Sequence, residues 1–408
     1  MQHRIVVLGA GYTGAVAAGR LAKRLYREDV AITLVNPEPD FVERVRLHQL
    51  AAGQDLRPRP FGEMFAGTGV ELKLAKVIAV DVDRKAVMVG SAHGDGPEES
   101  AEESAEELAY DTLVYALGSG WDDGGVPGAA EHAHEVSSRR GALRLRDRLA
   151  ALDAGRPVVV VGGGLTGLEA ATEIAEARPD LDVALAVRGV LGDWLSQKGR
   201  AHLRKVVDGL GVTVHEHTEV AAVAADAVQT ADGRSIPSAV TVWTTGFAVH
   251  PIAQGTTLEL TDRGRIVVDA TMRSVSHPDV YAVGDAALAM GPGDKPLRMS
   301  CASGVPMAWQ AADAIAARLT GAKVPRATIR YFQQCISLGR KEGLIQFVTA
   351  DDRALDRALT GRVAALYKEL ICKGAAWGVT NPTVGMPSRR RHVVRQEART
   401  GARAEAAV

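Results

Sequence analysis

Val7-Leu8-Gly9-Ala10-Gly11-Tyr12-Thr13-Gly14 returns later in the chain as Val160-Val161-Gly162-Gly163-Gly164-Leu165-Thr166-Gly167. Each copy follows a run of apolar, mostly β-branched residues and opens an alanine-rich stretch, which is the order strand, glycine turn, helix. One such motif is a weak signal, because ordinary strand-to-helix turns also use glycine, but two copies in the same context are specific. The repeat predicts two dinucleotide-binding units of the Rossmann type in an α/β chain.

The three glycines of the first copy have separate roles. Gly9 allows the tight turn after the strand, Gly11 lacks the Cβ that would keep a pyrophosphate from the backbone, and Gly14 lets the helix pack closely on the strand. The N-terminus of the helix presents free N–H groups and a partial positive charge to the phosphates. With Tyr12 and Thr13 these residues form the first predicted cofactor site. The second consists of Gly162, Gly164, Leu165, Thr166 and Gly167.

Length and charge narrow the class of protein. A chain of 408 residues is too long for one core and suggests two or three domains. Its 49 acidic and 48 basic residues nearly cancel, so no overall field favours a nucleic acid partner. No apolar stretch approaches the ~20 residues that span a bilayer. Because the first residues already read as a core strand, we expect no signal peptide and a cytoplasmic protein.

The order of expected elements is that of two glycine-loop units followed by a tail. The first unit has a helix to about Arg27 and strands at 30–35, 70–89 and 110–117, interrupted by the acidic, low-complexity segment 94–107, which we expect to be a disordered loop. The second unit has strands at 158–161, 183–187 and 240–245. A helix from about Pro306 to Leu319, a hairpin at 328–338 and 343–348, an amphipathic helix at 354–373 and an arginine-rich end follow.

At these residues the chain resembles the two-dinucleotide-binding-domain flavoproteins of the pyridine nucleotide-disulfide oxidoreductase superfamily. The resemblance rests on the paired glycine loops, on the segments YDTLVYALGS (residues 110–119) and VTVWTTGF (240–247), and on VYAVGDAA (280–287). Within the superfamily, the order of motifs and GGGLTGLE (162–169) look most like type II NADH dehydrogenases. The resemblance covers about residues 1–320.

It implies an α/β fold with two Rossmann-like domains and a C-terminal α+β interface domain. The expected boundaries are 1–122 and 262–322 for a discontinuous FAD domain, 123–261 for an NAD(P)H domain, and 323–408 for the interface domain with a basic tail. Asp285 in VGDAA then matches the aspartate that holds the flavin side of FAD. The strand-ending Gly118 and Gly246, together with Gly284, complete the implied cofactor contacts.

Two positions depart from the family pattern. Asn36 stands at the end of the second strand, where an acidic residue would bind the adenosine ribose of FAD, and Glu38 is a substitute for that contact. Arg188 stands at the equivalent position of the second unit. A carboxylate there would accept the 2′-hydroxyl of NADH, whereas a guanidinium attracts the 2′-phosphate of NADPH. The sequence favours NADPH over NADH, and a solvated surface arginine is the alternative.

The chemistry implied by the resemblance needs no protein dithiol. Cys301, Cys335 and Cys372 form no C-x-x-C or C-x-x-x-x-C pair, which argues against disulfide exchange. Glu169 resembles the glutamate beside the nicotinamide, although a helix-start glutamate is the alternative. Residues Pro306, Met307 and Ala308 fall where relatives direct a helix N-terminus at the flavin.

These observations favour an FAD-dependent NAD(P)H oxidoreductase that passes electrons to a quinone or similar small acceptor. A flavoprotein acting on a specialised metabolite and a non-catalytic, FAD-containing redox sensor remain the alternatives. The stripe Leu355, Leu359, Val363, Leu366 and Leu370 of the last helix can lie on the inner face of a membrane, pack within the protein, or form a homodimer. No metal site is expected.

Overall fold

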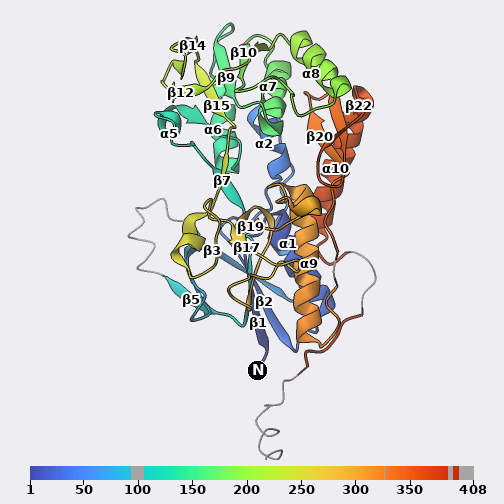
Figure 1. The fold of residues 1–408 in the computed structure, drawn as a ribbon. Coiled ribbons are helices and arrows are strands. Elements are labelled where there is room, and N and C mark those ends of the chain that lie inside the picture. Colours follow the sequence, from blue (N-terminus) through green and yellow to red (C-terminus); the bar gives the residue numbers. More distant parts are fainter. Residues whose placement is uncertain (93–104, 326, 385–388, 395–408) are drawn as a thin grey trace, which may run out of the picture.

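The computed structural model describes residues 1–92, 105–325, 327–384 and 389–394. Two β-sheets with helices on their faces lie one above the other in Figure 1, and the C-terminal segment runs along one side of the upper sheet. Most of the predicted acidic loop lies outside the described residues; its last residues begin strand β5. Mixed α/β architecture with two Rossmann-like sheets is confirmed.

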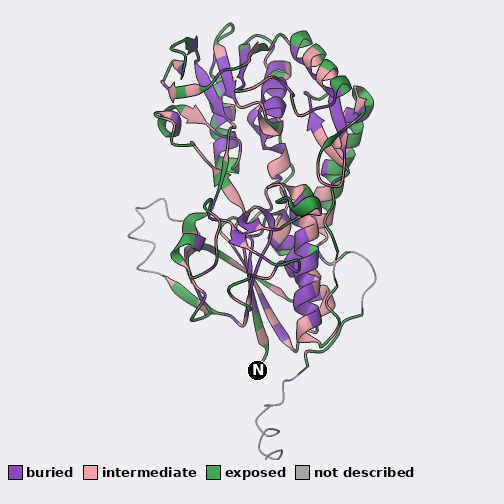
Figure 2. Cartoon of the chain, viewed as in Figure 1, coloured by how far each residue is buried: buried purple, intermediate pink, exposed green. Residues whose placement is uncertain are grey.

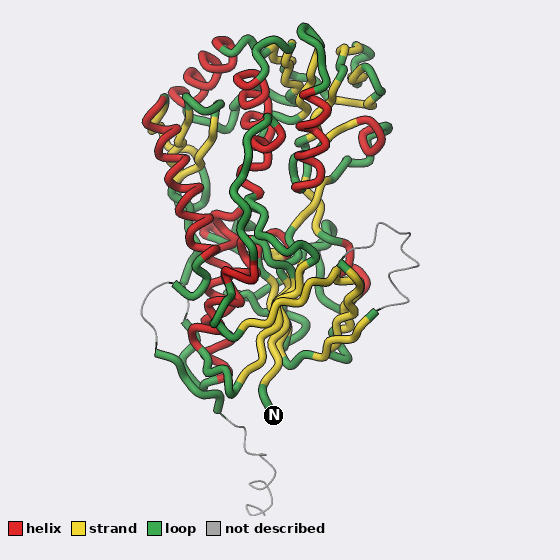
Figure 3. The backbone as a smooth tube through the Cα atoms, turned by 180° about the vertical axis from the view of Figure 1, so that it is seen from behind, coloured by secondary structure: helices red, strands yellow, loops and turns green. Residues whose placement is uncertain are grey.

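Figure 3 shows the lower, seven-stranded sheet from behind, and the first glycine loop follows its strand His3–Leu8. Its order is β18-β6-β1-β2-β3-β4-β5, parallel from β18 to β3 and antiparallel beyond. Because β18 comes from late in the chain, the sheet is built from two separated segments. The strands are β1 His3–Leu8, β2 Val30–Asn36, β3 Val70–Asp81, β4 Ala86–Ser91, β5 Glu106–Ala109, β6 Thr112–Tyr115 and β18 Val280–Ala282; helices α1 Tyr12–Arg24 and α9 Cys301–Leu319 pack together beside it.

The upper, five-stranded sheet contains the second glycine loop, and all its pairings are parallel. Its order is β11-β10-β9-β15-β8, and a small antiparallel sheet, β12-β13-β14, lies next to it. The strands are β8 Ala133–His134, β9 Pro157–Val161, β10 Asp182–Ala186, β11 Thr213–His215, β12 Val220–Val223, β13 Ala227–Thr230, β14 Ser235–Pro237 and β15 Val240–Trp243; the helices are α5 Ala129–His132, α6 Arg139–Ala150, α7 Leu165–Ala177 and α8 Gln197–Gly209.

Short elements connect the two halves. Strand β7 (Ser119–Trp121) pairs with β16 (Phe247–Val249) between the halves, whereas β17 (Ile266–Val267) pairs with β19 (Ala287–Leu288) within the lower unit. Helix α3 (Phe61–Met64) stays with the first core, whereas α2 (Leu47–Ala51) packs between α6 and α7. Leu47 is fully buried in the core of the upper sheet, so a segment from the first unit helps to build the second.

The C-terminal segment is an antiparallel sheet followed by one long helix. Strands β20 (Gln333–Ser337) and β21 (Gly343–Val348) form the predicted hairpin, and β22 (Ala354–Thr360) pairs with β21. The predicted helix at 354–373 is wrong at its start, because residues 354–360 are this third strand. Gly361, at φ +80°, reverses the chain into α10 (Arg362–Thr380). One side of α10 remains exposed in Figure 2.

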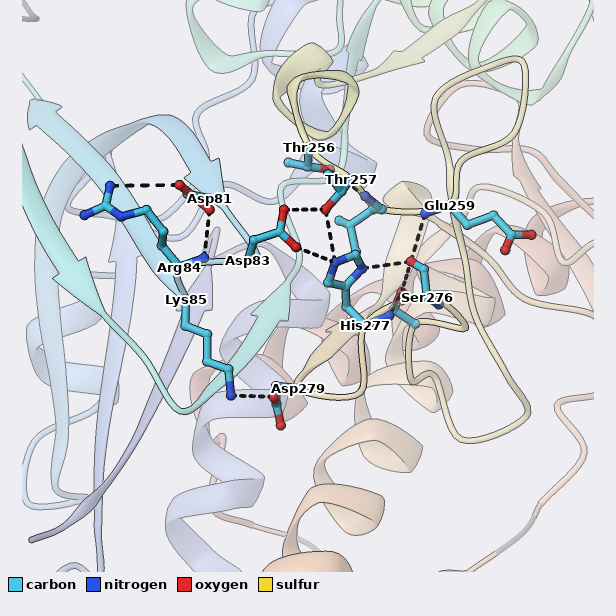
Figure 4. A network of polar contacts seen from close by, with 12 residues as sticks. Asp81, Asp83, Arg84, Lys85, Thr256, Thr257, Glu259, Ser276, His277 and Asp279 are labelled. Carbon is cyan, nitrogen blue, oxygen red and sulfur yellow. Dashed lines mark hydrogen bonds and ion pairs between the residues drawn. The ribbon is translucent and has the colours of Figure 1, made fainter.

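A surface network joins the β3–β4 turn to the late part of the lower unit (Figure 4). Asp83 accepts a hydrogen bond from the Thr257 hydroxyl at 2.9 Å and lies 3.3 Å from Nε2 of His277. Nδ1 of His277 lies 3.0 Å from the Ser276 hydroxyl. The Thr257 hydrogen bond is the main cause of a lowered Asp83 pKa. The Ser276 hydroxyl also accepts from the backbone N–H of Glu259, so the arrangement ties loops together.

Candidate cofactor and active site

A cavity of about 520 Å³ opens between the two sheets and contacts both glycine loops. It combines segments from the first loop, from the end of β6, from the segment after β18, from α7 and from α10. Its predicted lining residues are Gly9, Gly11, Tyr12, Thr13, Asn36, Gly118, Gly164, Leu165, Thr166, Glu169, Gly284 and Asp285. The fold therefore brings twelve residues that are widely spaced in sequence to one place.

The first glycine loop has the shape that a pyrophosphate requires. Gly9 has φ +89°, and a Cβ on Gly14 would lie 1.7 Å from the carbonyl oxygen of Gly9. A Cβ on Gly11 would meet no protein atom within 4 Å, because this residue faces the open cavity at the start of α1. The open position at Gly11 and the helix N-terminus behind it fit an FAD pyrophosphate.

Asp285 lines the same cavity as that loop, and its role on the flavin side of FAD stays a prediction. It belongs to a short 3₁₀ turn that follows β18, and its Oδ2 accepts a hydrogen bond from the Ser119 hydroxyl at 2.6 Å. Gly284 has φ +74° and would place a Cβ 3.0 Å from a Thr13 methyl carbon. This close approach packs the late segment against the first loop.

The side-chain amide of Asn36 forms hydrogen bonds with the protein backbone. Its Oδ1 accepts from the N–H of Ala10 at 3.0 Å, and its Nδ2 donates to the carbonyl oxygen of Glu38 at 2.8 Å. The side chain thus fastens the end of β2 to the first loop. Its contact with an adenosine ribose stays a prediction.

The second loop repeats this geometry but is more open beyond the glycines. Gly162 has φ +124°, and a Cβ on Gly167 would lie 1.8 Å from the carbonyl oxygen of Gly162, while Gly164 is open. Gly162 and Gly167 thus shape the turn without lining the cavity. Arg188 is exposed after β10, outside the cavity and without a polar contact to a described residue. Gly246 also lies outside it, against Asp122.

Glu169 is the charged centre of the cavity wall on α7. Its Oε1 accepts from Nζ of Lys368 at 2.8 Å and from the N–H of Ser337 at 3.0 Å. Its Oε2 lies 3.9 Å from Nδ1 of His48, on α2. Lys368 also donates to the carbonyl oxygen of Cys335 at 3.0 Å. Three elements far apart in sequence thus meet at one carboxylate.

The ion pair between Glu169 and Lys368 fixes the charges here. Burial, the largest single influence, would raise the pKa of Glu169, but the electrostatic interactions with Lys368 and His48, together with the hydrogen bonds from Lys368 and Ser337, outweigh it, and the pKa falls below its ordinary value. Burial likewise opposes the charge on Lys368, but Glu169 raises its pKa overall. Burial lowers the pKa of His48 to about 4, against the attraction of Glu169. Near pH 7 the site contains a carboxylate, an ammonium and a neutral imidazole.

The helix expected to begin at Pro306 begins five residues earlier. Ser300 occupies the N-cap position of α9 without a side-chain capping hydrogen bond, and Cys301 is the first helical residue, so Pro306 lies inside the helix. Met307 and Ala308 are buried in the core, and the cavity is lined instead by Met299, Ser300 and Cys301. The sequence prediction treated proline as a helix start. The structure instead places Pro306 in the second turn of α9.

Sequence reasoning missed Lys368 and His48. Lys368 lies outside the predicted apolar stripe of the last helix, but it points inward with Ala364, Cys372 and Ala376, which are buried at four-residue intervals. That spacing of small residues around one lysine was the available signal. His48 had no comparable signal, because its position depends on α2 entering the upper core.

Two stacked sheets, each with a glycine loop that reaches a shared cavity, define an oxidoreductase with two dinucleotide-binding units. The chain belongs to the pyridine nucleotide-disulphide oxidoreductase family, whose model matches residues 3–316. This membership confirms the predicted family, the class of flavoprotein oxidoreductase, and FAD with NADPH or NADH as cofactors.

Named relatives carry related activities. An NADH dehydrogenase-like protein of Mycobacterium tuberculosis is 29% identical over 330 residues, covering 74% of this chain and 78% of its own length. The demethylphylloquinone reductase of Synechocystis is 26% identical over 304 residues, with 70% and 72% covered. The structure of NDH2 from Plasmodium falciparum with NADH shares the fold at a TM-score of 0.76, with 14% identity and 94% and 98% covered.

Two features are absent from the described residues. None of their helices is long and apolar enough to cross a membrane. The same residues contain no group of histidine, cysteine and acidic side chains suited to hold a metal ion.

Proposed function

We propose that this protein is an FAD-dependent NAD(P)H oxidoreductase that transfers hydride equivalents from NAD(P)H to its flavin and then electrons to a quinone or a similar small acceptor. The observation that carries the proposal is that one cavity contacts both glycine loops. Such a cavity allows two dinucleotides to bring their reactive rings together. The bound flavin supplies the two-electron chemistry, and the protein supplies position and charge.

The residues that would hold FAD come from both parts of the lower unit. The Gly9–Gly14 loop would cradle the pyrophosphate on the N-terminus of α1, with Gly118 close by. Asp285, oriented by Ser119, would hold the flavin side. The Gly164–Thr166 segment would receive the pyrophosphate of the nicotinamide cofactor, with Arg188 near its 2′-phosphate.

Glu169 and Lys368 would position the reacting partners. Their ion pair places fixed charges at the wall of a partly enclosed cavity, where such charges act more strongly than in water. Because the Ser337 N–H also holds the carboxylate, its orientation is set before a ligand arrives. We propose that Glu169 orients the nicotinamide and that Lys368 faces the acceptor side.

Dithiol exchange is not part of the proposal. All three cysteines are free, and burial raises the pKa of each thiol, that of Cys335 to about 11. Thiolates are the nucleophiles in disulfide exchange, so these thiols are poorly suited to it. The electrons must therefore leave the flavin directly for the acceptor.

The acceptor class rests on relatives and on α10. Demethylphylloquinone reductase is a quinone-reducing relative. On α10, Val363, Leu366 and Leu370 are each about 60% exposed, next to a second cavity of about 450 Å³ lined by Arg340, Lys341, Arg362 and Lys368. We propose that this face contacts a membrane surface peripherally and that an apolar acceptor arrives there. The earlier stripe members Leu355 and Leu359 belong to β22 instead.

Anaerobic mixing with NADPH or NADH, followed by a quinone, tests the function. Flavin bleaching by the nicotinamide and rapid reoxidation by quinone support it. Bleaching followed by slow reoxidation with every quinone would favour a specialised metabolite as acceptor. Failure of both nicotinamides to bleach the flavin would favour a redox sensor and reject the proposal.

Vesicle flotation of wild type and of the double variant Leu366→Glu/Leu370→Glu tests the membrane contact. Light scattering would detect a homodimer.

A further inference from the structure

Helix α7 carries three carboxylic acids on one face, and the mechanism above uses only one. Glu169, Glu173 and Glu176 are separated by four and three residues, so they lie above one another on the helix. Glu169 reaches the cavity, whereas Glu176 meets the β20–β21 turn through the N–H of Arg340 and, at 3.6 Å, through Lys341. The row therefore leads from the cavity to the edge of the protein.

Glu173, the middle member, is unusual for a structural residue. It is 1% exposed, and its Oε1 accepts a hydrogen bond from Nε2 of Gln54. Its Oε2 is buried and has no partner among the described residues. A buried carboxylate with an unsatisfied oxygen is costly, whereas the protonated acid is much less so. Glu169 lies one helical turn away, about 6 Å along the helix axis.

The groups around Glu173 bring its pKa close to neutral pH. Burial raises its pKa most; Arg340 lowers it, the neighbouring Glu176 and Glu169 raise it, and the Gln54 hydrogen bond lowers it. The result is a pKa of about 7. Lys368, which lines both cavities, holds its proton too tightly to release it, since its pKa is raised. A group that titrates near the working pH exchanges protons in both directions.

The proposed reaction requires a proton from solvent. With a quinone as acceptor the balance is NAD(P)H + H⁺ + quinone → NAD(P)⁺ + quinol, because the nicotinamide supplies two electrons and one proton. We propose that Glu173 is a proton-relay residue that carries this proton from Glu176 at the surface to Glu169 in the cavity. The inference rests on the proposed function and identifies the path by which its second substrate, the proton, enters.

Glu173→Gln tests the relay, because glutamine keeps the shape and loses the proton. We expect quinone turnover to fall about tenfold or more, with a larger solvent isotope effect, since proton transfer becomes limiting. Anaerobic flavin reduction by NAD(P)H should be unchanged. Turnover with ferricyanide, which takes electrons and no proton, should also be unchanged. In Glu173→Ala, azide as a small weak acid should restore part of the quinone rate.

Gln54→Leu is the matched control, because it removes the hydrogen bond and keeps the carboxyl group. Its quinone rate should survive, with the pH profile displaced upward, since that bond lowers the Glu173 pKa. Infrared titration supplies a readout independent of turnover: a protonated carboxyl should ionise near pH 7 in wild type and be missing in Glu173→Gln.

The outcomes separate the two proposals. If wild type reduces quinone and Glu173→Gln does so equally on both sides of pH 7, the relay is overturned and the proposed function stands. Absence of the infrared carboxyl signal from wild type would also overturn the relay. If wild type shows no quinone turnover at all, the proposed function fails and takes the relay with it.

Discussion

Helices α1 and α7 occupy equivalent places after the two glycine loops, yet their faces differ. Counted from the last glycine of each motif, Val16, Arg20 and Lys23 of α1 correspond to Glu169, Glu173 and Glu176 of α7. Arg20 forms a two-pronged ion pair with Asp313 of α9, at 2.6 and 2.8 Å, and this pair closes the lower unit. The same face of α7 carries carboxylates toward the C-terminal segment instead. The equivalent helix face therefore packs against α9 in the lower unit and against the C-terminal segment in the upper unit.

The first glycine loop is also more enclosed by protein than the second. The first loop is fastened by Asn36 and faced by Asp285, which comes from a distant part of the chain. After the second loop, Arg188 is exposed and has no described polar partner. A closed site suits a cofactor that stays bound, and an open one suits a cofactor that exchanges in every turnover. Four predictions test this contrast, beginning with the largest effect.

Matched substitutions in the two loops should each block the binding of one cofactor and leave the other cofactor bound. A Cβ at Gly11 or Gly164 meets no protein atom within 4 Å, so valine at either position should leave the fold intact. Gly11→Val should give colourless protein because its side chain occupies the pyrophosphate position, whereas Gly164→Val should stay yellow and resist reduction by NAD(P)H. Absorbance spectra and stopped-flow reduction measure both. Equal flavin content in the two variants would contradict the assignment of the loops.

Breaking the ion pair on α7 should cost stability as well as rate. Glu169→Gln leaves the ammonium of Lys368 buried without its partner, which typically costs about 3–5 kcal/mol. Urea unfolding measures that loss, and flavin reduction by NAD(P)H should also slow. The double variant Glu169→Gln/Lys368→Met should recover most of the stability and none of the rate. Full recovery of the rate would return Glu169 to a purely structural role.

The free energy of unfolding should depend on pH through Glu173 of α7, whose counterpart on α1 is Arg20. Glu173 has a pKa of about 7 when folded and 4.5 when free, so the folded state binds the proton more tightly. Its contribution to stability is complete below pH 4.5 and is lost as the pH rises through 7, a total of about 3 kcal/mol. Glu173→Gln should therefore be more stable than wild type above pH 7 and similar below 4.5. Identical unfolding curves at high pH would show that Glu173 is not held protonated.

The repeated motif was enough to predict both sheets, because strand, glycine turn and helix are local patterns. The Glu169–Lys368 pair was not predictable, since it depends on how the C-terminal helix docks on α7. The start of α9 was misplaced because Pro306 is a local signal that the neighbouring packing overrides. The exact domain boundaries stay a prediction, and α2 illustrates the difficulty: it lies in the proposed FAD segment and packs in the other core.

The smallest of the four effects concerns the open second site. Arg188 is exposed where an NADH-specific site would place a carboxylate, and a charge-assisted contact with a 2′-phosphate contributes ~1.5–3 kcal/mol, roughly ten- to a hundredfold in affinity. NADPH should therefore outperform NADH in wild type, and Arg188→Glu should reverse the order by replacing attraction with repulsion. Because the contact is exposed, salt should weaken NADPH binding more than NADH binding. Steady-state kinetics with both cofactors at two salt concentrations measure this. A wild-type preference for NADH that Arg188→Glu leaves unchanged would mean that Arg188 faces only solvent, and that the openness of this site carries no cofactor selection.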